Sequence, residues 1–256
     1  MILIKTDKEI ASMREGGRRL AEIIEEIGRK ILPGKSTLEL DQLAEKLVFA
    51  KGGVPAFKGY GKESGKPFPG TICVSINQEV VHGIPKEEKI IQEGDLVTID
   101  IGMKYEGMIT DMARTYGAGK ISREVQKIIE VSREALRLGE TVLKDGIKLG
   151  DYSRAVEKYV HSKDFFVCRD LVGHGVGREL HEDPYVPNYV SGAPEEKIIL
   201  KKNMTLALEP IINGGTYEVK LGRDGWVWET KDGSLSAQFE DTVVITEDGC
   251  EILTKV

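Results

Sequence analysis

The sequence predicts an α+β fold built from two similar halves, each of which runs from two helices into antiparallel strands. Two observations support this prediction: the helix–helix–strand order occurs twice, and the strands are joined by hairpin turn signals. When Gly34 is placed on Gly146, the stretch LDQLAEKLV at 40–48 aligns with YSRAVEKYV at 152–160. We therefore expect an internal pseudo-repeat.

Length and composition are those of an ordinary globular protein. The 256 residues, 40% hydrophobic and 30% charged, are enough for one large domain, which we expect over 1–256 with halves at roughly 1–120 and 121–256. A net charge of −6 gives no overall attraction to nucleic acid, and three cysteines without CxxC spacing indicate reduced thiols. The N-terminus soon becomes polar and no apolar run approaches the ~20 residues that span a bilayer, so we expect a cytoplasmic protein without membrane contact.

Each half begins with two amphipathic helices. Capping boxes start the first two, and glycines or breaks in the pattern end them. Apolar residues recur at helical spacing on one face of each, which is typical of helices that cover a core. The expected positions are 6–31, Ser36 up to Gly52-Gly53, Ser122 up to the break at 144–146, and from that break through Val160.

The stretch LVTIDIGMKYEGMITDMARTY at 96–116 predicts a hairpin whose apolar strands are interrupted by two aspartates. A turn centred on Tyr105-Glu106 would make Asp100 and Asp111 direct cross-strand partners, with Cβ atoms about 4.5–5.5 Å apart. Two carboxylates that close repel each other unless a proton or a cation lies between them. A bound metal ion is the obvious candidate.

The second half repeats this arrangement with glutamates. Glu209 interrupts the strand MTLALEPII, and Glu240 lies in SAQFEDTVVIT. A hairpin centred on the turn signal Asp224-Gly225 would pair the two, and a bulge is expected at Asn213-Gly214-Gly215. Because an unpartnered buried carboxylate is costly, four that converge require a cation.

Three of the four histidines, His82, His174 and His181, lie beside glycines or in predicted loops near these strands, whereas His161 ends a polar helix. Four carboxylates and one imidazole form a hard, oxygen-rich ligand set, unlike a thiolate-rich zinc site. Two divalent ions held there would lower the pKa of a bridging water towards neutrality, to about 7 for a single strong site. The resulting hydroxide could attack a carbonyl or phosphoryl centre.

Five separated motifs make the chain resemble the type I methionine aminopeptidases, which are metallopeptidases with the pita-bread fold. Spread over residues 72 to 242, they are ICVSINQEVVHGIP, TIDIG with TDMARTY, GHGVG with LHEDP, LALEP, and DGWVWETKDGSLSAQFEDT. The resemblance implies a central curved antiparallel sheet covered by helices. It also implies an enzyme that removes the initiator methionine from nascent chains whose second residue is small, by means of a water activated by two metal ions.

The resemblance further implies a ligand role for each matching residue. Asp100 would bind one ion, Asp111 and Glu240 would bridge both ions, and His174 and Glu209 would bind the second. Oxygen and nitrogen ligands do not choose among Fe, Mn and Co.

The same resemblance implies the residues that handle the substrate. Glu209 would shuttle a proton from the attacking water, His82 would contact the scissile amide nitrogen or the substrate amine, and His181 would steady the carbonyl oxygen. The loop at 61–67 is longer than in some members of the family, and Leu180 stands where some members have an aromatic residue. The side chains expected to surround the methionine are Tyr60, Phe68, Cys73 and Trp226.

Three alternatives share this fold. An Xaa-Pro aminopeptidase or prolidase has the same ligands but usually carries a sizeable N-terminal domain, for which Asp100 lies too early in this chain. A non-enzymatic binding module would have lost its metal ligands. A type II methionine aminopeptidase would need a helical insert that does not fit between His181 and Glu209.

As partners we expect N-terminal methionyl peptides of nascent chains and no specific nucleic acid. We also expect a monomer, and no interpretable motif encodes a transient contact with the ribosome.

Overall fold

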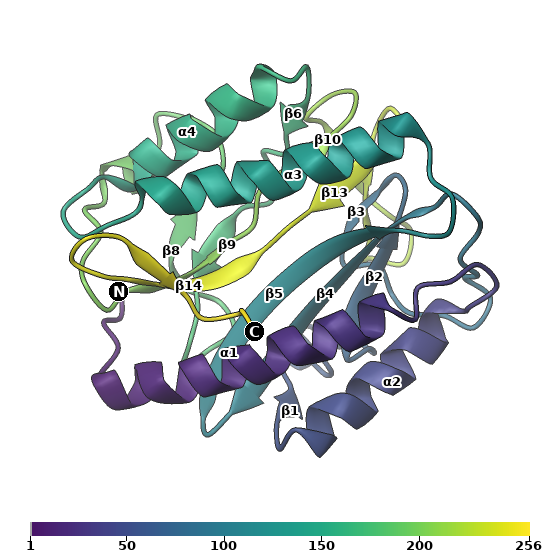
Figure 1. Ribbon diagram of the computed structural model, residues 1–256, viewed down its shortest axis with the longest axis horizontal. Coiled ribbons are helices and arrows are strands. Elements are labelled where there is room, and N and C mark those ends of the chain that lie inside the picture. The colour runs from purple at the N-terminus through teal and green to yellow at the C-terminus, as the bar shows by residue number, and fades with distance from the viewer. Residues whose placement is uncertain (1) are drawn as a thin grey trace.

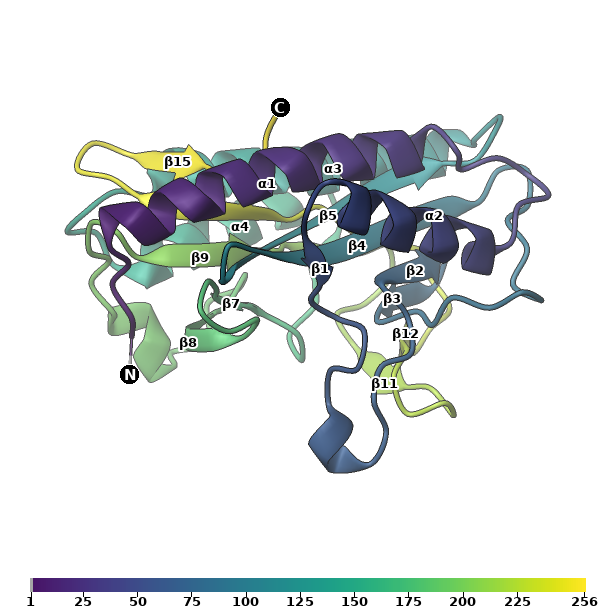
Figure 2. The ribbon, with the colours of Figure 1, turned by 90° about the horizontal axis from the view of Figure 1, so that it is seen from below.

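The computed structural model describes residues 2–256 and places four long helices on one side of a layer of strands (Figures 1 and 2). One pair, α1 and α2, lies beside the other pair, α3 and α4, and several short strands project from the opposite side of the layer (Figure 2). The order of the pairs along the chain follows the predicted order. The division into pseudo-symmetric halves and the assignment of 1–256 to a single catalytic domain stay predictions. The helices are α1 (Asp7–Gly28), α2 (Thr37–Ala50), α3 (Arg123–Val142) and α4 (Leu149–His161).

The helix starts are confirmed by their caps. Thr6 accepts a hydrogen bond from the backbone of Glu9, and the Glu9 carboxylate accepts one from the backbone of Thr6. Ser36 and Glu39 form the same capping box before α2. The end of the first helix was predicted too late, because α1 stops at Gly28 and residues 29–31 form tighter turns before Pro33.

The first-half strands form one antiparallel sheet in which β4 is central. On one side β4 pairs with β2, and near its end with the short β1, while its other side pairs with β5 along ten residue pairs. The bounds are β1 (Val54–Pro55), β2 (Ile72–Ile76), β4 (Leu96–Tyr105) and β5 (Met108–Gly117).

The predicted register of the hairpin between β4 and β5 is wrong by two residues, because the turn lies one position later than predicted. The turn is Glu106-Gly107, whose φ angles of 47° and 85° suit a two-residue loop with left-handed backbone at both positions. Consequently Asp100 pairs with Ala113, and Asp111 pairs with Gly102. The two aspartates are therefore diagonal neighbours on one face of the sheet and not direct partners.

The second-half strands form a five-stranded sheet and two three-stranded sheets. The five-stranded sheet has the order β15-β14-β9-β7-β8, and β3 from the first half completes one of the smaller sheets. The two 3₁₀ turns are η1 (Lys62–Ser64) and η2 (Pro194–Lys197). The remaining bounds are β3 (Glu79–Val81), β6 (Phe166–Val167), β7 (Gly173–Gly175), β8 (Glu182–Val186), β9 (Thr205–Leu208), β10 (Ile211–Asn213), β11 (Val219–Leu221), β12 (Trp228–Thr230), β13 (Ser236–Gln238), β14 (Asp241–Ile245) and β15 (Cys250–Ile252).

The register predicted around Glu209 and Glu240 is confirmed. Leu208 pairs with Asp241 on one side of the two glutamates, and Ile211 pairs with Gln238 on the other. Val219 pairs with Thr230 in the same register, farther along the two strands. The bulge expected at 213–215 therefore does not change the pairing. The ladder therefore closes at the loop that contains Asp224-Gly225.

Two apolar clusters stabilise the layered arrangement, one under each helix pair. Under α1 and α2 lie side chains from the helix-facing side of β4, whereas Asp100 points to the other side, as predicted. Each fully buried aliphatic side chain contributes about 1.5–3 kcal/mol, so these clusters offset the cost of burying several carboxylates elsewhere. Representative members are Leu20, Ile24, Val48, Val97 and Ile99 in the first cluster, and Ile128, Val156, Leu206, Leu208 and Val243 in the second.

Candidate metal centre and adjoining pocket

Three predicted ligands meet on the face of the strands that points away from the helices. One ligand atom from each of Asp111, His174 and Glu240 lies within 4.8 Å of the other two, and all three side chains are buried. Asp111 comes from β5, His174 from β7, and Glu240 directly precedes β14. Residues far apart in the sequence thus form a group that could hold a cation.

The other two predicted ligands, Asp100 and Glu209, lie at the edge of this group. The Glu209 carboxylate has one oxygen 3.7 Å from Nε2 of His174 and accepts a hydrogen bond from Gln238 at 3.3 Å. Gln238 also donates to Glu240 at 3.4 Å. The sequence analysis missed Gln238, although its position two residues before Glu240 on an extended strand places both side chains on one face.

The carboxylates lack the partners that buried anions need. Oδ1 of Asp100, Oδ1 of Asp111 and Oε1 of Glu240 are buried without a hydrogen bond. Burial raises the pKa of Asp111 to about 7. Burial and the neighbouring carboxylates also raise the pKa of Asp100, Glu209 and Glu240 well above their usual range. Orphaned oxygens and mutual repulsion are the conditions that a divalent cation relieves, so the residues fit a metal ion.

His174 is oriented to offer a lone pair to this group. Its Nδ1 lies 2.8 Å from the backbone carbonyl of Gly175, and because a carbonyl only accepts, Nδ1 carries the proton. Nε2 is then unprotonated and faces the carboxylates. Burial, together with the nearby His181, lowers the pKa of His174 to about 3, which keeps the imidazole neutral at physiological pH.

A small pocket of about 70 Å³ adjoins Asp100. All four side chains predicted to surround a methionine line it, as do His82 and His181. Phe68 reaches the lining despite the long 61–67 loop, and Leu180 contributes an aliphatic wall. Phe57 is also in the lining, and the sequence analysis missed it because it lies in an irregular segment without a readable periodicity.

The two histidines of the pocket differ in how they are held. His82 has a φ of 58°, a left-handed conformation that directs its ring from the end of β3 towards Trp226, with ring centroids 6.3 Å apart. Burial and the nearby His181 lower the pKa of His82 to about 4. His181 has its Nδ1 2.7 Å from the Tyr60 hydroxyl and its ring 4.4 Å from that of His174. His161 is exposed, as predicted, and its ring lies beside that of Phe166 with centroids 6.2 Å apart, outside the pocket lining.

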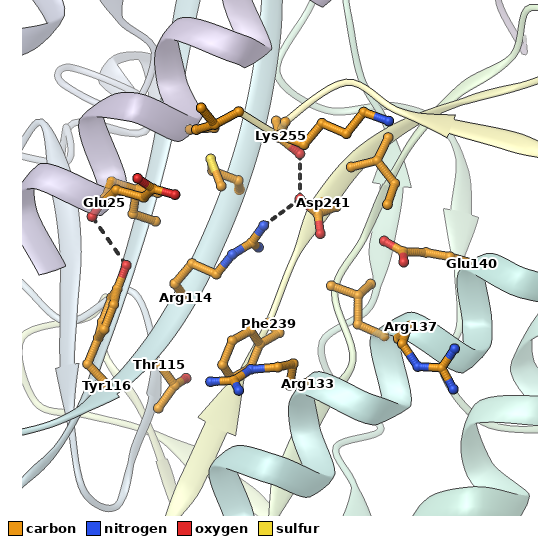
Figure 3. A pocket seen from close by; sticks show the side chains of 17 residues that line it. Glu25, Arg114, Thr115, Tyr116, Arg133, Arg137, Glu140, Phe239, Asp241 and Lys255 are labelled. Carbon is orange, nitrogen blue, oxygen red and sulfur yellow. Dashed lines mark hydrogen bonds and ion pairs between the residues drawn. The ribbon is translucent and has the colours of Figure 1, made fainter.

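A second pocket, larger than the one beside Asp100, lies on the opposite side of β5. A pocket of about 500 Å³ opens on the helix-facing side of β5 and contains Arg114, Glu140 and Asp241 (Figure 3). Successive side chains of a strand point to opposite faces, which explains why this pocket is separate from the metal centre. Met112, Arg114 and Tyr116 point to the pocket, and Asp111 points to the metal-binding side. No pattern in the sequence indicates this pocket.

The stability of the metal-free protein should fall as the pH rises from about 6.5 to 9. In this window the folded chain keeps protons on carboxylates with raised pKa, whereas the unfolded chain has released them, so the folded state binds more protons and stability falls. His82 and His174 contribute in the opposite direction around their unfolded-state pKa of 6.5, and this contribution is nearly complete about one pH unit above that value. The expected loss is on the order of a few kcal/mol, measured by urea unfolding in EDTA.

Two variants identify the source of that pH dependence. Burial raises the pKa of Glu140, in the large pocket, to about 8, so Glu140→Gln tests whether that pocket causes the effect. We expect the free energy of unfolding to fall with pH almost as steeply in Glu140→Gln as in the wild type, and less steeply in Glu240→Gln. Excess Mn²⁺ should stabilise the wild type most at high pH. A flat or rising stability between pH 6.5 and 9 would contradict the expected electrostatics.

Two further findings concern the cysteines and the helices. Cys73, Cys168 and Cys250 are free thiols. Within residues 2–256, none of the helices combines the length and apolar content required to cross a bilayer.

Comparison with known proteins identifies the family. A sequence profile of metallopeptidase family M24 matches residues 11–247. Methionine aminopeptidase 1 of Bacillus subtilis is 46% identical over 256 residues, covering 100% of both chains. The crystal structure of methionine aminopeptidase from Thermotoga maritima superposes with a TM-score of 0.95 at 44% identity, again over 100% of both chains.

The fold is shared more widely than the sequence. An X-Pro aminopeptidase from Thermotoga maritima has a TM-score of 0.76 at 22% identity, and this chain covers only 62% of it. That similarity concerns the fold alone and supports the predicted α+β, pita-bread architecture. Full-length similarity at over 40% identity is found with the methionine aminopeptidases. The chain therefore belongs to metallopeptidase family M24 and, within it, to the type I methionine aminopeptidases.

Proposed function

We propose that this enzyme removes the N-terminal methionine from nascent proteins and peptides whose second residue is small. The observation that carries the proposal is the convergence of Asp111, His174 and Glu240, with orphaned carboxylate oxygens, beside a small apolar pocket. The full-length similarity to methionine aminopeptidases supports it.

In this proposal five residues hold two divalent ions, and Fe, Mn and Co all suit the ligand set. Asp100, Asp111, His174, Glu209 and Glu240 would hold the ions, with Asp100 on one side of the group, His174 and Glu209 on the other, and Asp111 and Glu240 shared between them. When bound, the ions supply a hydroxide nucleophile by lowering the pKa of a water. The number of ions per chain is testable by metal analysis of the purified protein.

Glu209 is the proposed proton carrier. Burial and the charge of Asp111 raise the pKa of the Glu209 carboxyl well above that of a free glutamate, which makes its carboxylate a stronger base. Its hydrogen bond from Gln238 fixes the carboxylate close to the other ligands. Glu209 can therefore take a proton from the attacking water and pass it towards the leaving amine.

The two pocket histidines are proposed to orient the scissile bond. If the Tyr60 hydroxyl donates to Nδ1 of His181, then Nε2 of His181 carries a proton and can donate to the substrate carbonyl oxygen. His82, neutral above about pH 4, can hydrogen-bond the amide nitrogen or the substrate amine. Together they hold the carbonyl in position for attack.

The pocket suits a flexible thioether side chain. Phe68 and Trp226 face each other edge-on with centroids 5.3 Å apart, which provides an aromatic surface for sulfur. Burial and nearby carboxylates raise the pKa of the Cys73 thiol well above its usual range, so Cys73 stays neutral and lines the pocket as a small apolar residue.

A peptide panel tests this proposal. With Mn²⁺, Fe²⁺ or Co²⁺ added to chelator-treated protein, methionine should be released from Met-Ala-x peptides roughly tenfold or more faster than from Met-Leu-x. Ala-Ala-x serves as the control without methionine. Preference for x-Pro peptides would favour the prolidase alternative, and cleavage that does not depend on metal would refute the proposal.

The proposed substrates also suggest a setting. Nascent chains bearing an initiator methionine are made in the cytoplasm, and we propose that the enzyme acts there as a monomer, with any ribosome contact being transient.

A further inference from the structure

Strand β5 meets β14, and the residues directly before β14, at a seam that joins segments far apart in the sequence. Ala113 and Glu240 are the backbone partners at its centre: the N–H of Glu240 donates to the carbonyl of Ala113 at 2.9 Å, and the reverse bond is 3.3 Å long. Asp111 lies two residues before Ala113. The seam therefore joins the two segments that carry the proposed bridging ligands.

On either side of this central pair, a threonine hydroxyl takes the place of the partner backbone. Oγ1 of Thr242 accepts from the N–H of Asp111 at 2.9 Å and donates to the carbonyl of Asp111 at 2.8 Å. Oγ1 of Thr115 accepts from the N–H of Gln238 at 3.0 Å and donates to its carbonyl at 2.6 Å. Each hydroxyl satisfies both backbone groups of the residue opposite.

The backbone of Thr242 is occupied by a different segment. Its N–H donates to Oγ1 of Thr254 at 3.1 Å, and its carbonyl accepts from the N–H of Leu253 at 2.8 Å. The hydroxyl is thus the group by which Thr242 holds Asp111. Because a side chain lies between the two backbones, the strands are held farther apart here than in a directly bonded pair.

Glu240 is held from the helix-facing side as well. Nη1 of Arg114 donates to the carbonyl of Glu240 at 2.6 Å. Nη2 of Arg114 donates to Asp241 at 2.8 Å (Figure 3). Asp241 also accepts from Oγ1 of Thr254 at 2.6 Å. The backbone at Glu240 therefore has little freedom to follow a displaced Asp111.

We propose that Thr242 and Thr115 are positioning residues that set the spacing of the Asp111 and Glu240 carboxylates and thereby the affinity of the centre for divalent ions. The inference rests on the proposed metal centre. Metal–oxygen bonds are about 2.0–2.2 Å long, so a carboxylate displaced by about 1 Å no longer reaches an ion held by its neighbours. The hydroxyls determine this displacement because they are the spacers across the seam.

The test compares Mn²⁺ binding to chelator-treated wild type and variants by isothermal titration calorimetry. Thr242→Val keeps the shape and removes the hydroxyl, and we expect it to weaken Mn²⁺ binding about tenfold or more, in the range typical of residues that orient metal ligands. Thr242→Ser keeps the hydroxyl and should bind Mn²⁺ as the wild type does. Circular dichroism checks that each variant is folded.

Thr37 provides a matched control. Its hydroxyl makes the same pair of bonds to one backbone residue, donating to the carbonyl of Lys86 at 3.0 Å and accepting from its N–H at 2.9 Å, but at the start of α2. Thr37→Val should lower the melting temperature, as Thr242→Val does, and leave Mn²⁺ affinity unchanged. If Thr242→Val does not fold, Thr115→Val carries the same expectation of weakened binding.

Wild-type Mn²⁺ affinity in folded Thr242→Val, or an equal loss of affinity in Thr37→Val, would overturn the inference and leave the proposed function intact. If the wild type itself binds no Mn²⁺, Fe²⁺ or Co²⁺, the proposed metal centre is overturned and the spacer role with it.

Discussion

Replacing Glu209 by glutamine should lower kcat for a Met-Ala peptide by about 10²–10⁴-fold, with a much smaller change in KM. The amide keeps the size of the side chain but cannot accept a proton. Glu209 also has an oxygen 3.7 Å from Nε2 of His174, so the ion content of the variant must be measured beside its rate. Steady-state kinetics at saturating metal give the two constants.

Glu240→Gln is the matched comparison for this experiment. Glu240 is proposed only as a ligand, so its loss should lower activity in proportion to the loss of bound metal. Glu209→Gln should lose more activity than its remaining metal explains. An unchanged kcat in Glu209→Gln, or a loss accounted for by metal content alone, would rule out the proton-carrying role.

Replacing His82 by alanine should leave folding and metal content intact and reduce kcat/KM by about 10²–10³-fold. His82 lines the pocket beside Asp100 but is outside the group of Asp111, His174 and Glu240, so its loss removes a substrate contact and not a metal ligand. Metal analysis together with the rate on Met-Ala-x measures both parts of this expectation.

The backbone of His82 calls for a second variant. At a φ of 58°, alanine adds left-handed strain to the loss of the imidazole, whereas asparagine tolerates this conformation better. His82→Asn should therefore be more stable than His82→Ala and similarly slow. Loss of metal in both variants would mean that His82 belongs to the ligand set, and near-normal turnover in His82→Asn would exclude the proposed contact.

Helices and strand registers differed in how well the sequence predicted them. Capping boxes at Thr6 and Ser36 placed two helix starts correctly, because the side-chain oxygens that satisfy free N–H groups are encoded locally. The ladder around Glu209 was predicted correctly from a turn signal fifteen residues away. The hairpin at Glu106-Gly107 was not, since Tyr105-Glu106 and Glu106-Gly107 fit the same apolar pattern and only the glycine favours the second.

The candidate site was accessible from sequence to the extent that its residues interrupt apolar strands. Asp100, Asp111, Glu209 and Glu240 stand out for that reason, and His174 stands out between glycines. Phe57 and Gln238 do not, because an aromatic residue in an irregular segment and a polar residue on a strand have many ordinary uses. The role of Thr242 and Thr115 could not be predicted from the sequence, because threonine is common in strands. Their role depends on which backbone lies opposite, which only the structure shows.

Because the carboxylates lie on both sides of the β5–β14 seam, the fraction of protein that is folded should depend on the concentration of the metal. An ion that binds Asp111 and Glu240 together cross-links strands that are far apart in the unfolded chain. A ligand that binds only the folded state adds about 2.7 kcal/mol of stability at a concentration one hundred times its Kd. In a cell short of the metal, a larger fraction of the protein would be unfolded and degraded, so its amount would fall together with its activity. The amount of the protein would then depend on the supply of the metal.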